Sequence, residues 1–407
     1  MYDILNYVSG FIWGPFTLIL ILGTGIFLSL GLKGFTLTYI AVAFKQLFSK
    51  EEDSSSGEIS SFQSLTTALS ATVGTGNIAG VATAIFVGGP GAIFWMWVSA
   101  VFGMATKFAE AFLAIKYREK NELGETIGGP MYYIKNGLTS KFIVFAYLFA
   151  AAGMIAALGI GNGVQVNSVS QVINNEFGFS TFSIGIVIAI LVALVILGGI
   201  KSIGNITSKL VPVMSLVYIL GGLLIIILNS SQVGYVFNLI VTSAFTSTAA
   251  TGGFAGATVW MALRYGVARG VFSNEAGLGS SPIAHAAAKT NNPVKQGMIS
   301  MLEPLIDTLI VCTITAFVIL MSNQWVGEIN GAVLTVASFE NLLANGKYIV
   351  IFGLILFSFS TIIGWSYYGE KCVEFLFGSG VIIYYRILWI VIIPVSYTHL
   401  TLPTNDV

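Results

Sequence analysis

The chain alternates between long apolar runs and short polar segments. A membrane-spanning helix needs about 20 mostly apolar residues. Runs of this kind predict ten candidate spans, with the bounds 11–32, 62–87, 91–115, 142–160, 182–200, 211–228, 236–263, 298–321, 349–365 and 381–395. The pattern is typical of an all-α membrane protein.

Composition supports the membrane class and narrows the possible partners. Hydrophobic residues make up 56% of the 407 residues and charged residues 9%, against about 25% in soluble domains. The net charge is zero and no basic tract is present, so we expect no nucleic-acid partner. Cys312 and Cys372 fall in different predicted spans, which favours packing over a disulfide or a metal site.

Basic residues concentrate in every second connecting loop. With Lys107, Lys347 and Arg386 as the exceptions, 15 of the 18 Lys and Arg residues fall on one predicted side of the membrane. Lys and Arg are retained on the cytoplasmic side. We therefore expect a multi-pass protein of the cell membrane with its N-terminus outside.

Two of the predicted spans carry glycine-rich interruptions. The second contains "SATVGTGNIAG" (residues 70–80), and the seventh contains "TGGFAG" (residues 251–256). Gly costs about 1 kcal/mol relative to Ala inside a helix, and close helix packing through small residues is one interpretation. However, the two spans have opposite predicted directions and corresponding places in the two halves. This arrangement is typical of inverted-repeat transporters, whose site lies near the bilayer midplane.

An unwound segment exposes backbone groups that can bind ions. A half-helix ending near Val73 presents carbonyl oxygens, which suit a cation. A half-helix beginning near Asn77 presents N–H groups, which suit an anion such as a carboxylate. The break thus predicts a site for a zwitterion and a small cation.

Four segments together carry a family resemblance. They are "SATVGTGNIAGVATAIFVGGPGAIFWMW", "GGPMYYI", "ATGGFAGATVWMALRYGVARGVFSNEAGLGSSPIAHAAA" and "STIIGWSYYGEKC". The chain resembles, from about Met1 to Pro394, the alanine or glycine:cation symporter family, also called sodium:alanine symporters. The resemblance implies a leucine-transporter-like fold, with a 5+5 inverted repeat, one extra N-terminal span and eleven spans in all. It also implies import of alanine or glycine with Na+ as the coupling ion.

The resemblance divides the chain into four parts. Residues 1–60 form a peripheral span with a cytoplasmic linker, 61–207 the first repeat and 208–395 an incomplete second repeat. The tail at 396–407, "SYTHLTLPTNDV", resembles the translation of a transposase adapter. We expect this tail to be non-native and the eleventh span to be lost by truncation.

The sodium site implied by the resemblance lies between the second and ninth predicted spans. Its ligands are the backbone carbonyls of Ser70 and Val73 and the hydroxyls of Ser360 and Thr361. Oxygen ligands without a full set of carboxylates suit a releasable sodium ion better than a divalent ion. For the two hydroxyls, the alternative is a hydrogen bond back to their own helix.

The resemblance also implies contacts for both charged groups of the substrate. The carboxylate is expected at the amides of Thr75 and Gly76, with the Asn77 side chain nearby. The ammonium group is expected at the carbonyls of Thr251, Gly252 and Gly253.

Three further side chains are candidates for the pocket wall. Gln165 is expected to contact the substrate, unless it is a solvated loop amide. Phe254 and Trp365 are expected to cap the pocket and to limit it to a side chain about the size of a methyl group. The alternative for both aromatics is packing or an interfacial belt.

Acidic residues inside a span are functional hypotheses by default. Glu303 and Asp307 are four residues apart on the eighth predicted span. They could pair with Lys107 as a structural or gating lock, or relay protons. The segment "SNEAGLGSSPIAH" is interpreted as a cytoplasmic re-entry, with Asn274 and Glu275 near a helix start.

An enzyme is not expected. Catalysis would need a nucleophile with a base or a metal cluster, and His285 alone provides neither. The alternatives that stay open are a proton-coupled or differently selective amino-acid transporter and a non-transporting amino-acid sensor. The expected partners are therefore the amino acid, sodium and the lipid bilayer, and the oligomeric state stays unknown.

Overall fold

A computed structural model of the chain describes residues 10, 12–49, 56–247 and 257–399. The α-helices are α2 (Pro15–Gly31), α3 (Phe35–Thr38), α4 (Ile40–Leu47), α5 (Ser61–Thr72), α6 (Ala79–Gly88), α7 (Gly91–Lys116), α8 (Pro130–Gly137), α9 (Ile143–Ala156), α10 (Val164–Phe177), α11 (Thr181–Ile196), α12 (Gly199–Leu228), α13 (Val233–Ser243), α14 (Val259–Asn274), α15 (Pro282–Ala286), α16 (Pro293–Ser300), α17 (Leu302–Pro304), α18 (Thr313–Ser322), α19 (Gly331–Leu342), α20 (Lys347–Phe377) and α21 (Ile382–His399). Short 3₁₀ turns are η1 (Thr75–Asn77), η2 (Ser140–Phe142), η4 (Ser230–Gln232), η6 (Gln324–Val326) and η7 (Ser379–Val381), and π-helical turns are η3 (Ala157–Gly163) and η5 (Leu305–Cys312). In the described part of the chain, β1 (Glu119–Lys120) and β2 (Thr126–Ile127) pair antiparallel, Glu119 opposite Ile127.

Several helical stretches have the length and composition of membrane spans. Among the described residues, five are long and apolar enough to cross a bilayer: Gly91–Lys116, Ser140–Phe177, Gly199–Leu228, Pro293–Ser322 and Lys347–Phe377. Four shorter apolar stretches are Pro15–Gly31, Ala79–Gly88, Thr181–Ile196 and Ser379–Val395. The all-α membrane architecture is thus confirmed, whereas the span count and the inverted repeat stay predictions.

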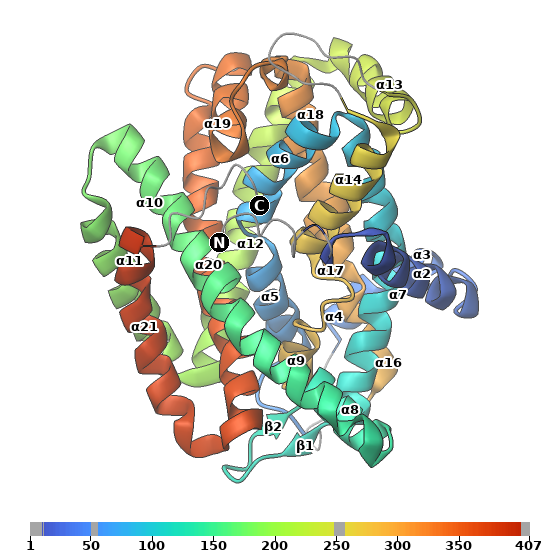
Figure 1. The fold of residues 1–407 in the computed structure, drawn as a ribbon, viewed down its shortest axis with the longest axis vertical. Helices are drawn as coiled ribbons and strands as arrows, with labels where there is room; N and C mark the ends of the chain where they lie inside the picture. Colours follow the sequence, from blue (N-terminus) through green and yellow to red (C-terminus); the bar gives the residue numbers. More distant parts are fainter. Residues whose placement is uncertain (1–9, 11, 50–55, 248–256, 400–407) are drawn as a thin grey trace.

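The long helices form an inner group and an outer group. The apolar windows of α20 and of Pro293–Ser322 are 72% buried, and that of α7 is 67% buried. The corresponding window of Ser140–Phe177 is 17% buried, and Leu148 of α9 is exposed. Figure 1 shows α9 and α10 crossing the front diagonally, with α5, α6 and α14 near the centre. Exposed apolar helices on the outside suit contact with lipid.

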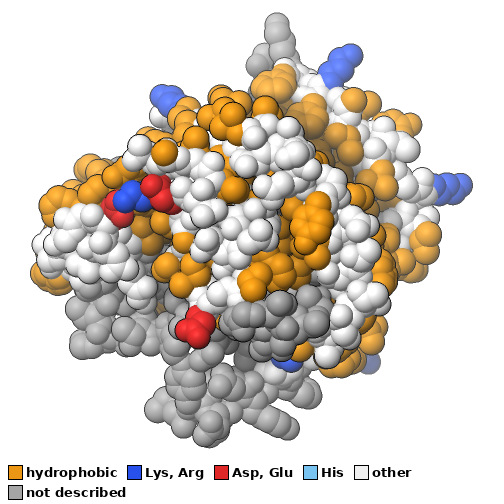
Figure 2. Space-filling view, turned by 90° about the horizontal axis from the view of Figure 1, so that it is seen from above, with side chains coloured by type: hydrophobic (Ala, Val, Ile, Leu, Met, Phe, Trp, Pro, Cys, Tyr) orange, Lys and Arg blue, Asp and Glu red, His pale blue; other side chains and the backbone are white. Residues whose placement is uncertain are grey.

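The two ends of the molecule are formed by different elements. In Figure 1, β1, β2 and α8 lie at the lower end, and α13 and α19 lie at the upper end. Lys120 of β1 and Lys135 of α8 belong to the expected basic side. Figure 2, the view onto the upper end, shows mostly apolar and uncharged side chains. Acidic residues lie at the lower end as well, Glu119 and Glu374 among them, so the orientation of the chain in the membrane stays a prediction.

Two of the predicted loops are helical in the structure, so these predictions are wrong. The predicted loop at 161–181 is helical as far as Phe177, because Asn162, Gln165 and Ser170 point into the protein and are buried. Their polarity lowered the local hydropathy without ending the helix. Lys201 and Lys209, expected in a loop, lie in α12.

The region of the predicted seventh span contains two separate helices. α13 ends at Ser243, and α14 runs from Val259 to Asn274, beyond the expected bound at 263. The helix start expected at Asn274 and Glu275 is wrong, because α14 ends there. Glu275 has φ +56°, and Gly277 and Gly279 have φ +91° and +76°, left-handed conformations that a right-handed helix cannot contain. Residues 275–281 form the irregular segment between α14 and α15.

Candidate functional site

The predicted break in the second span is present. α5 begins with a capping box between Ser60 and Gln63 and ends at Thr72, and the chain continues through η1 into α6. A Cβ on Gly74 would lie 2.6 Å from the Thr361 hydroxyl oxygen. Glycine at this position thus allows α20 to approach the unwound backbone closely.

The Asn77 side chain closes this break from behind. Its Oδ1 accepts a hydrogen bond from the Gly74 N–H at 2.9 Å, and its Nδ2 donates to Asp307 Oδ1 at 2.6 Å. Asn77 is fully buried and is absent from the lining of the adjacent cavity. Its amide connects η1 to η5.

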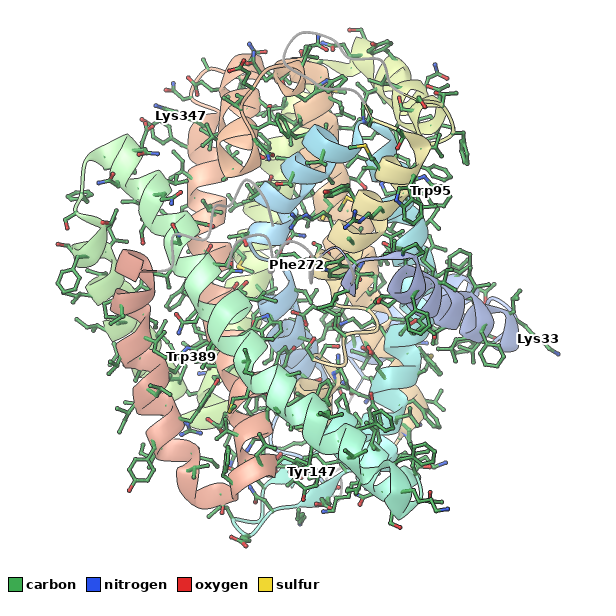
Figure 3. All side chains as sticks on the ribbon, in the orientation of Figure 1. Lys33, Trp95, Tyr147, Phe272, Lys347 and Trp389 are labelled. Atoms are coloured by element: carbon green, nitrogen blue, oxygen red, sulfur yellow. The ribbon has the colours of Figure 1, made fainter. Side chains whose placement is uncertain are left out.

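A narrow cavity lies beside the break. Its lining residues are Ala71, Thr72, Gly74, Gly76, Ile160, Gln165, Phe272, Glu275, Thr361 and Trp365. The cavity volume is about 10 Å³, room for about one water molecule. Figure 3 shows Phe272 near the middle of the long axis, between Lys347 toward the upper end and Tyr147 toward the lower end. The cavity therefore lies near the middle of the long axis.

The end of α14 contributes two cavity residues that the sequence analysis missed. Phe272 and Glu275 line the cavity from the side of the irregular segment 275–281. The glycines at 277 and 279, directly after α14, were the signal that could have identified the irregular segment 275–281. The predicted residues Thr251, Gly252, Gly253 and Phe254 lie outside the described part of the chain.

Gln165 and Trp365 both line the cavity beside the break. Gln165 is 2% exposed, so the loop interpretation is wrong. Its Oε1 accepts a long hydrogen bond, 3.4 Å, from the Thr75 N–H. A Cβ on Gly161 would lie 2.3 Å from Trp365 Cβ, so the indole rests directly on the backbone of η3. Trp365 is thus held in the cavity wall.

The four expected cation ligands come together between α5 and α20. Ser360 Oγ lies 3.3 Å from the Ser70 carbonyl oxygen, and Thr361 Oγ1 lies 3.5 Å from that of Val73. Both hydroxyls also donate back to the Phe357 carbonyl, at 2.8 and 2.9 Å, so the alternative of helix back-bonding holds as well. Two oxygens at right angles around an ion about 2.4 Å away are about 3.4 Å apart. The four oxygens are thus gathered at the end of α5, at distances that are also those of long hydrogen bonds.

Glu303 belongs to a buried ion-pair network. Its Oε2 lies 2.8 Å from Lys107 Nζ, and its Oε1 lies 2.6 Å from His285 Nε2, with all three side chains fully buried. Gln296 Nε2 lies 2.5 Å from His285 Nδ1 and donates to Ser64 Oγ at 2.8 Å. The network joins α5, α7, α15, α16 and α17. A lone histidine gave no sequence signal for this role.

Asp307 belongs to a different network although it is four residues from Glu303. Besides Asn77, its carboxylate accepts hydrogen bonds from Ser273 Oγ at 2.8 Å and Thr308 Oγ1 at 2.7 Å. Ser273 lies near the end of α14, and Asn77 lies in η1. Asp307 thus links the two irregular segments, whereas Glu303 is neutralised by Lys107.

Comparison with known proteins supplies independent information. The profile of the "Sodium:alanine symporter family" matches residues 1–402. The sodium/alanine symporter AgcS of Methanococcus maripaludis is 51% identical over 96% of this chain and 87% of its own length. The putative sodium/proton-dependent alanine carrier protein YrbD of Bacillus subtilis is 40% identical over 92% of this chain and 78% of its own length.

A solved structure supports the fold. MhsT, determined in complex with L-phenylalanine, superimposes with a TM-score of 0.59 over 84% of this chain and 80% of its own, at 14% identity. Such a likeness shows a leucine-transporter-like fold and leaves the substrate open. The family consists of transporters and not of enzymes. The family profile matches nearly the whole length of this chain. The chain therefore belongs to the sodium:alanine symporter family, whose members couple amino-acid transport to a cation.

Proposed function

We propose that the protein imports a small neutral amino acid, alanine or glycine, together with sodium. The observation that carries this proposal is the break between α5 and α6, which Ser360 and Thr361 of α20 face at oxygen–oxygen distances of 3.3 and 3.5 Å. Two relatives, an alanine symporter and a putative alanine carrier, favour the same substrate class. Transport then proceeds by alternating access in the cell membrane, with the N-terminus outside.

The cation binds at the end of α5. The last carbonyls of a helix carry partial negative charge, and here the Ser70 and Val73 carbonyls are supplemented by two hydroxyls. This proposed set contains no carboxylate. A monovalent ion is therefore held weakly enough to be released inside, whereas a divalent ion usually needs denser negative charge.

The substrate carboxylate binds at the amides of Thr75 and Gly76, where the second half of the span begins. The Thr75 N–H donates only a long hydrogen bond, 3.4 Å, to Gln165 Oε1. It can donate to a carboxylate oxygen instead. Trp365 is fixed against Gly161 and cannot withdraw without moving the backbone. The wall therefore favours hydrogen or methyl as the substrate side chain.

Loading the site requires movement. A cavity of about 10 Å³ holds about one water molecule, which is too small for an amino acid. The inner helices must therefore separate for entry and again for release, as alternating access demands. The membrane potential contributes about 2.3 kcal/mol per charge per 100 mV to inward movement of the sodium ion.

Uptake into proteoliposomes tests the proposal. The full chain should accumulate labelled alanine or glycine only with an inward sodium gradient. The double substitution Ser360→Ala with Thr361→Val should raise the sodium concentration for half-maximal uptake at least about tenfold, because two of four ligands are lost. Ser366→Ala is the matched control, since Ser366 lies in the same helix, is buried and donates to the Ile363 carbonyl at 2.6 Å.

Other outcomes would replace this proposal. Uptake driven by a pH gradient alone would assign coupling to protons, and the buried Asp307 between the two irregular segments would be the first candidate carrier. Binding of alanine without uptake would identify a sensor. No response to alanine or glycine would shift the substrate to another amino acid.

A further inference from the structure

Glu275 is a buried carboxylate in the cavity wall, and the sodium and carboxylate sites leave it without a role. It lines the same cavity as Gly74 and Gly76 and is 2% exposed. No part of the proposed cation site or carboxylate site uses it. A charged group taken out of water is costly unless a partner compensates it.

The neighbouring basic side chain, Lys107, interacts with other residues. Lys107 Nζ is 2.8 Å from Glu303 and donates to Ser281 Oγ at 2.7 Å. In the described part of the chain, no Lys, Arg or His forms an ion pair with Glu275. Its Oε2 accepts a hydrogen bond from Ser280 Oγ, and no described residue donates to Oε1. One carboxylate oxygen is thus held in orientation while the other is left for a ligand.

The other buried acids of this region have partners on at least one carboxylate oxygen, although Glu110 Oε2 has none among the described residues. Glu303 is paired with Lys107 and His285, and Asp307 accepts hydrogen bonds from Asn77, Ser273 and Thr308. Glu110 Oε1 accepts a hydrogen bond from the Gly279 N–H at 3.1 Å, and Glu110 is not a cavity residue. Of these four acids, Glu275 alone faces the cavity.

The backbone holds Glu275 in an uncommon conformation. Its φ of +56° is left-handed, which costs energy for a residue with a Cβ. A Cβ on Gly103 of α7 would lie 2.8 Å from Ala276 Cβ, so the irregular segment packs closely against α7. The packing fixes the carboxylate at the cavity despite this cost, which is typical of a functional position.

We infer that Glu275 forms an ammonium subsite, in which its carboxylate binds the α-ammonium group of the transported amino acid. This inference rests on the proposed function and deepens it. The backbone amides of the break between α5 and α6 bind the anionic end of the zwitterion, and the Glu275 side chain of the irregular segment 275–281 binds the cationic end. A ligand with a hydroxyl in place of the ammonium group leaves the Glu275 charge unpaired and is rejected.

Paired ligands test this subsite. L-alanine and L-lactate share the carboxylate and the methyl group and differ in the ammonium group. Their binding to the full chain in nanodiscs is measured by competition with labelled alanine. Wild type should prefer alanine by at least about 100-fold, because a buried charge left unpaired costs several kcal/mol. Equal competition by lactate in wild type would overturn the inference without any variant.

Substitutions then assign the preference to the residue. Glu275→Gln should weaken alanine binding about 100-fold and reduce the alanine-to-lactate preference to below about tenfold, since the amide carries no charge. Glu110→Gln is the matched control, because it also removes a buried acid that touches the irregular segment. It should keep the preference of wild type even if stability falls. An unchanged preference in Glu275→Gln would refute the subsite.

The two levels of proposal fail differently. Wild type that neither binds nor transports alanine or glycine removes the proposed function, and the subsite with it. Wild type that transports alanine while Glu275→Gln keeps the full preference over lactate removes the subsite only. If Glu275→Gln does not fold, Glu275→Asp provides the test, since its shorter side chain should weaken alanine binding and leave lactate binding unchanged.

Discussion

The two irregular segments beside the cavity differ in the chemical groups that surround them. Between α5 and α6 the chain unwinds through Gly74, and the groups that face the cavity are neutral. Between α14 and α15 the segment 275–281 is bordered by charges, since Ser281 contacts Lys107, and the Gly279 N–H donates to Glu110. The first segment offers backbone dipoles, whereas the second is anchored to a buried charge network. The difference predicts distinct consequences of mutation in each.

The largest expected effect is a loss of stability when the charge network beside the segment 275–281 is broken. Lys107→Met leaves Glu303 with only His285 as a charge partner and frees Ser281. It should lower the free energy of unfolding by about 3–5 kcal/mol, the usual cost of breaking a buried ion pair from one side. Thermal unfolding in detergent measures this loss. The double variant with Glu303→Gln should recover most of the stability, and a double variant as unstable as the single one would contradict the pairing.

The next effect is on the first segment and should appear in function with little loss of stability. Gly74→Ala puts a methyl group 2.6 Å from the Thr361 hydroxyl and forces α20 away from the break. Uptake should fall about 100-fold, because a displacement near 1 Å costs that much at a preorganised site. Gly80→Ala in α6 meets no atom within 4 Å and serves as the control. Normal uptake by Gly74→Ala would remove the close approach from the mechanism.

The smallest effect concerns the link between the segments. Ser273→Ala removes one of the hydrogen bonds to Asp307 and should cost about 1–2 kcal/mol of unfolding free energy. Ser300→Ala removes a similar bond, 2.7 Å, to Glu303 within the charge network. The two variants should lose similar stability. Only Ser273→Ala should also shift the cation dependence of uptake, and identical shifts in both would show that Asp307 does not couple the segments.

The sequence predicted the first break because its signal is local. Glycines at 74 and 76 inside an apolar run indicate an interruption whatever surrounds them, and the third span, 91–115, matched α7 to one residue for the same reason. The irregular segment at 275–281 was not predicted, because Asn274, Glu275 and the serines after them lowered the hydropathy. They are buried against α7 through tertiary contacts, and hydropathy cannot distinguish a polar residue in a protein interior from one in a loop.

The same limit explains why the helix that continues after Gly161 and the contacts of His285 were not predicted. The polar residues after Gly161 looked like an exit from the membrane, yet η3 carries the helix onward and turns Gln165 toward Thr75. His285 had no partner within its own helix. Its contacts with Glu303 and Gln296 join residues 18 and 11 positions away in the sequence, and only the fold brings them together.

The continuous helix Ser140–Phe177 has a consequence for how the surrounding lipid acts on the site. Its 38 residues extend about 57 Å at 1.5 Å per residue, nearly twice the hydrocarbon thickness of about 30 Å. A helix of this length cannot lie parallel to the membrane normal with both ends inside the hydrocarbon layer. This agrees with its diagonal course in Figure 1. Leu148 and Ile155 in its first half are exposed, whereas the stretch 161–170, with Gln165, is mostly buried by protein. Bilayer thickness therefore acts on the inclination of this helix, and through it on the distance between the Gln165 amide and the unwound backbone that it contacts.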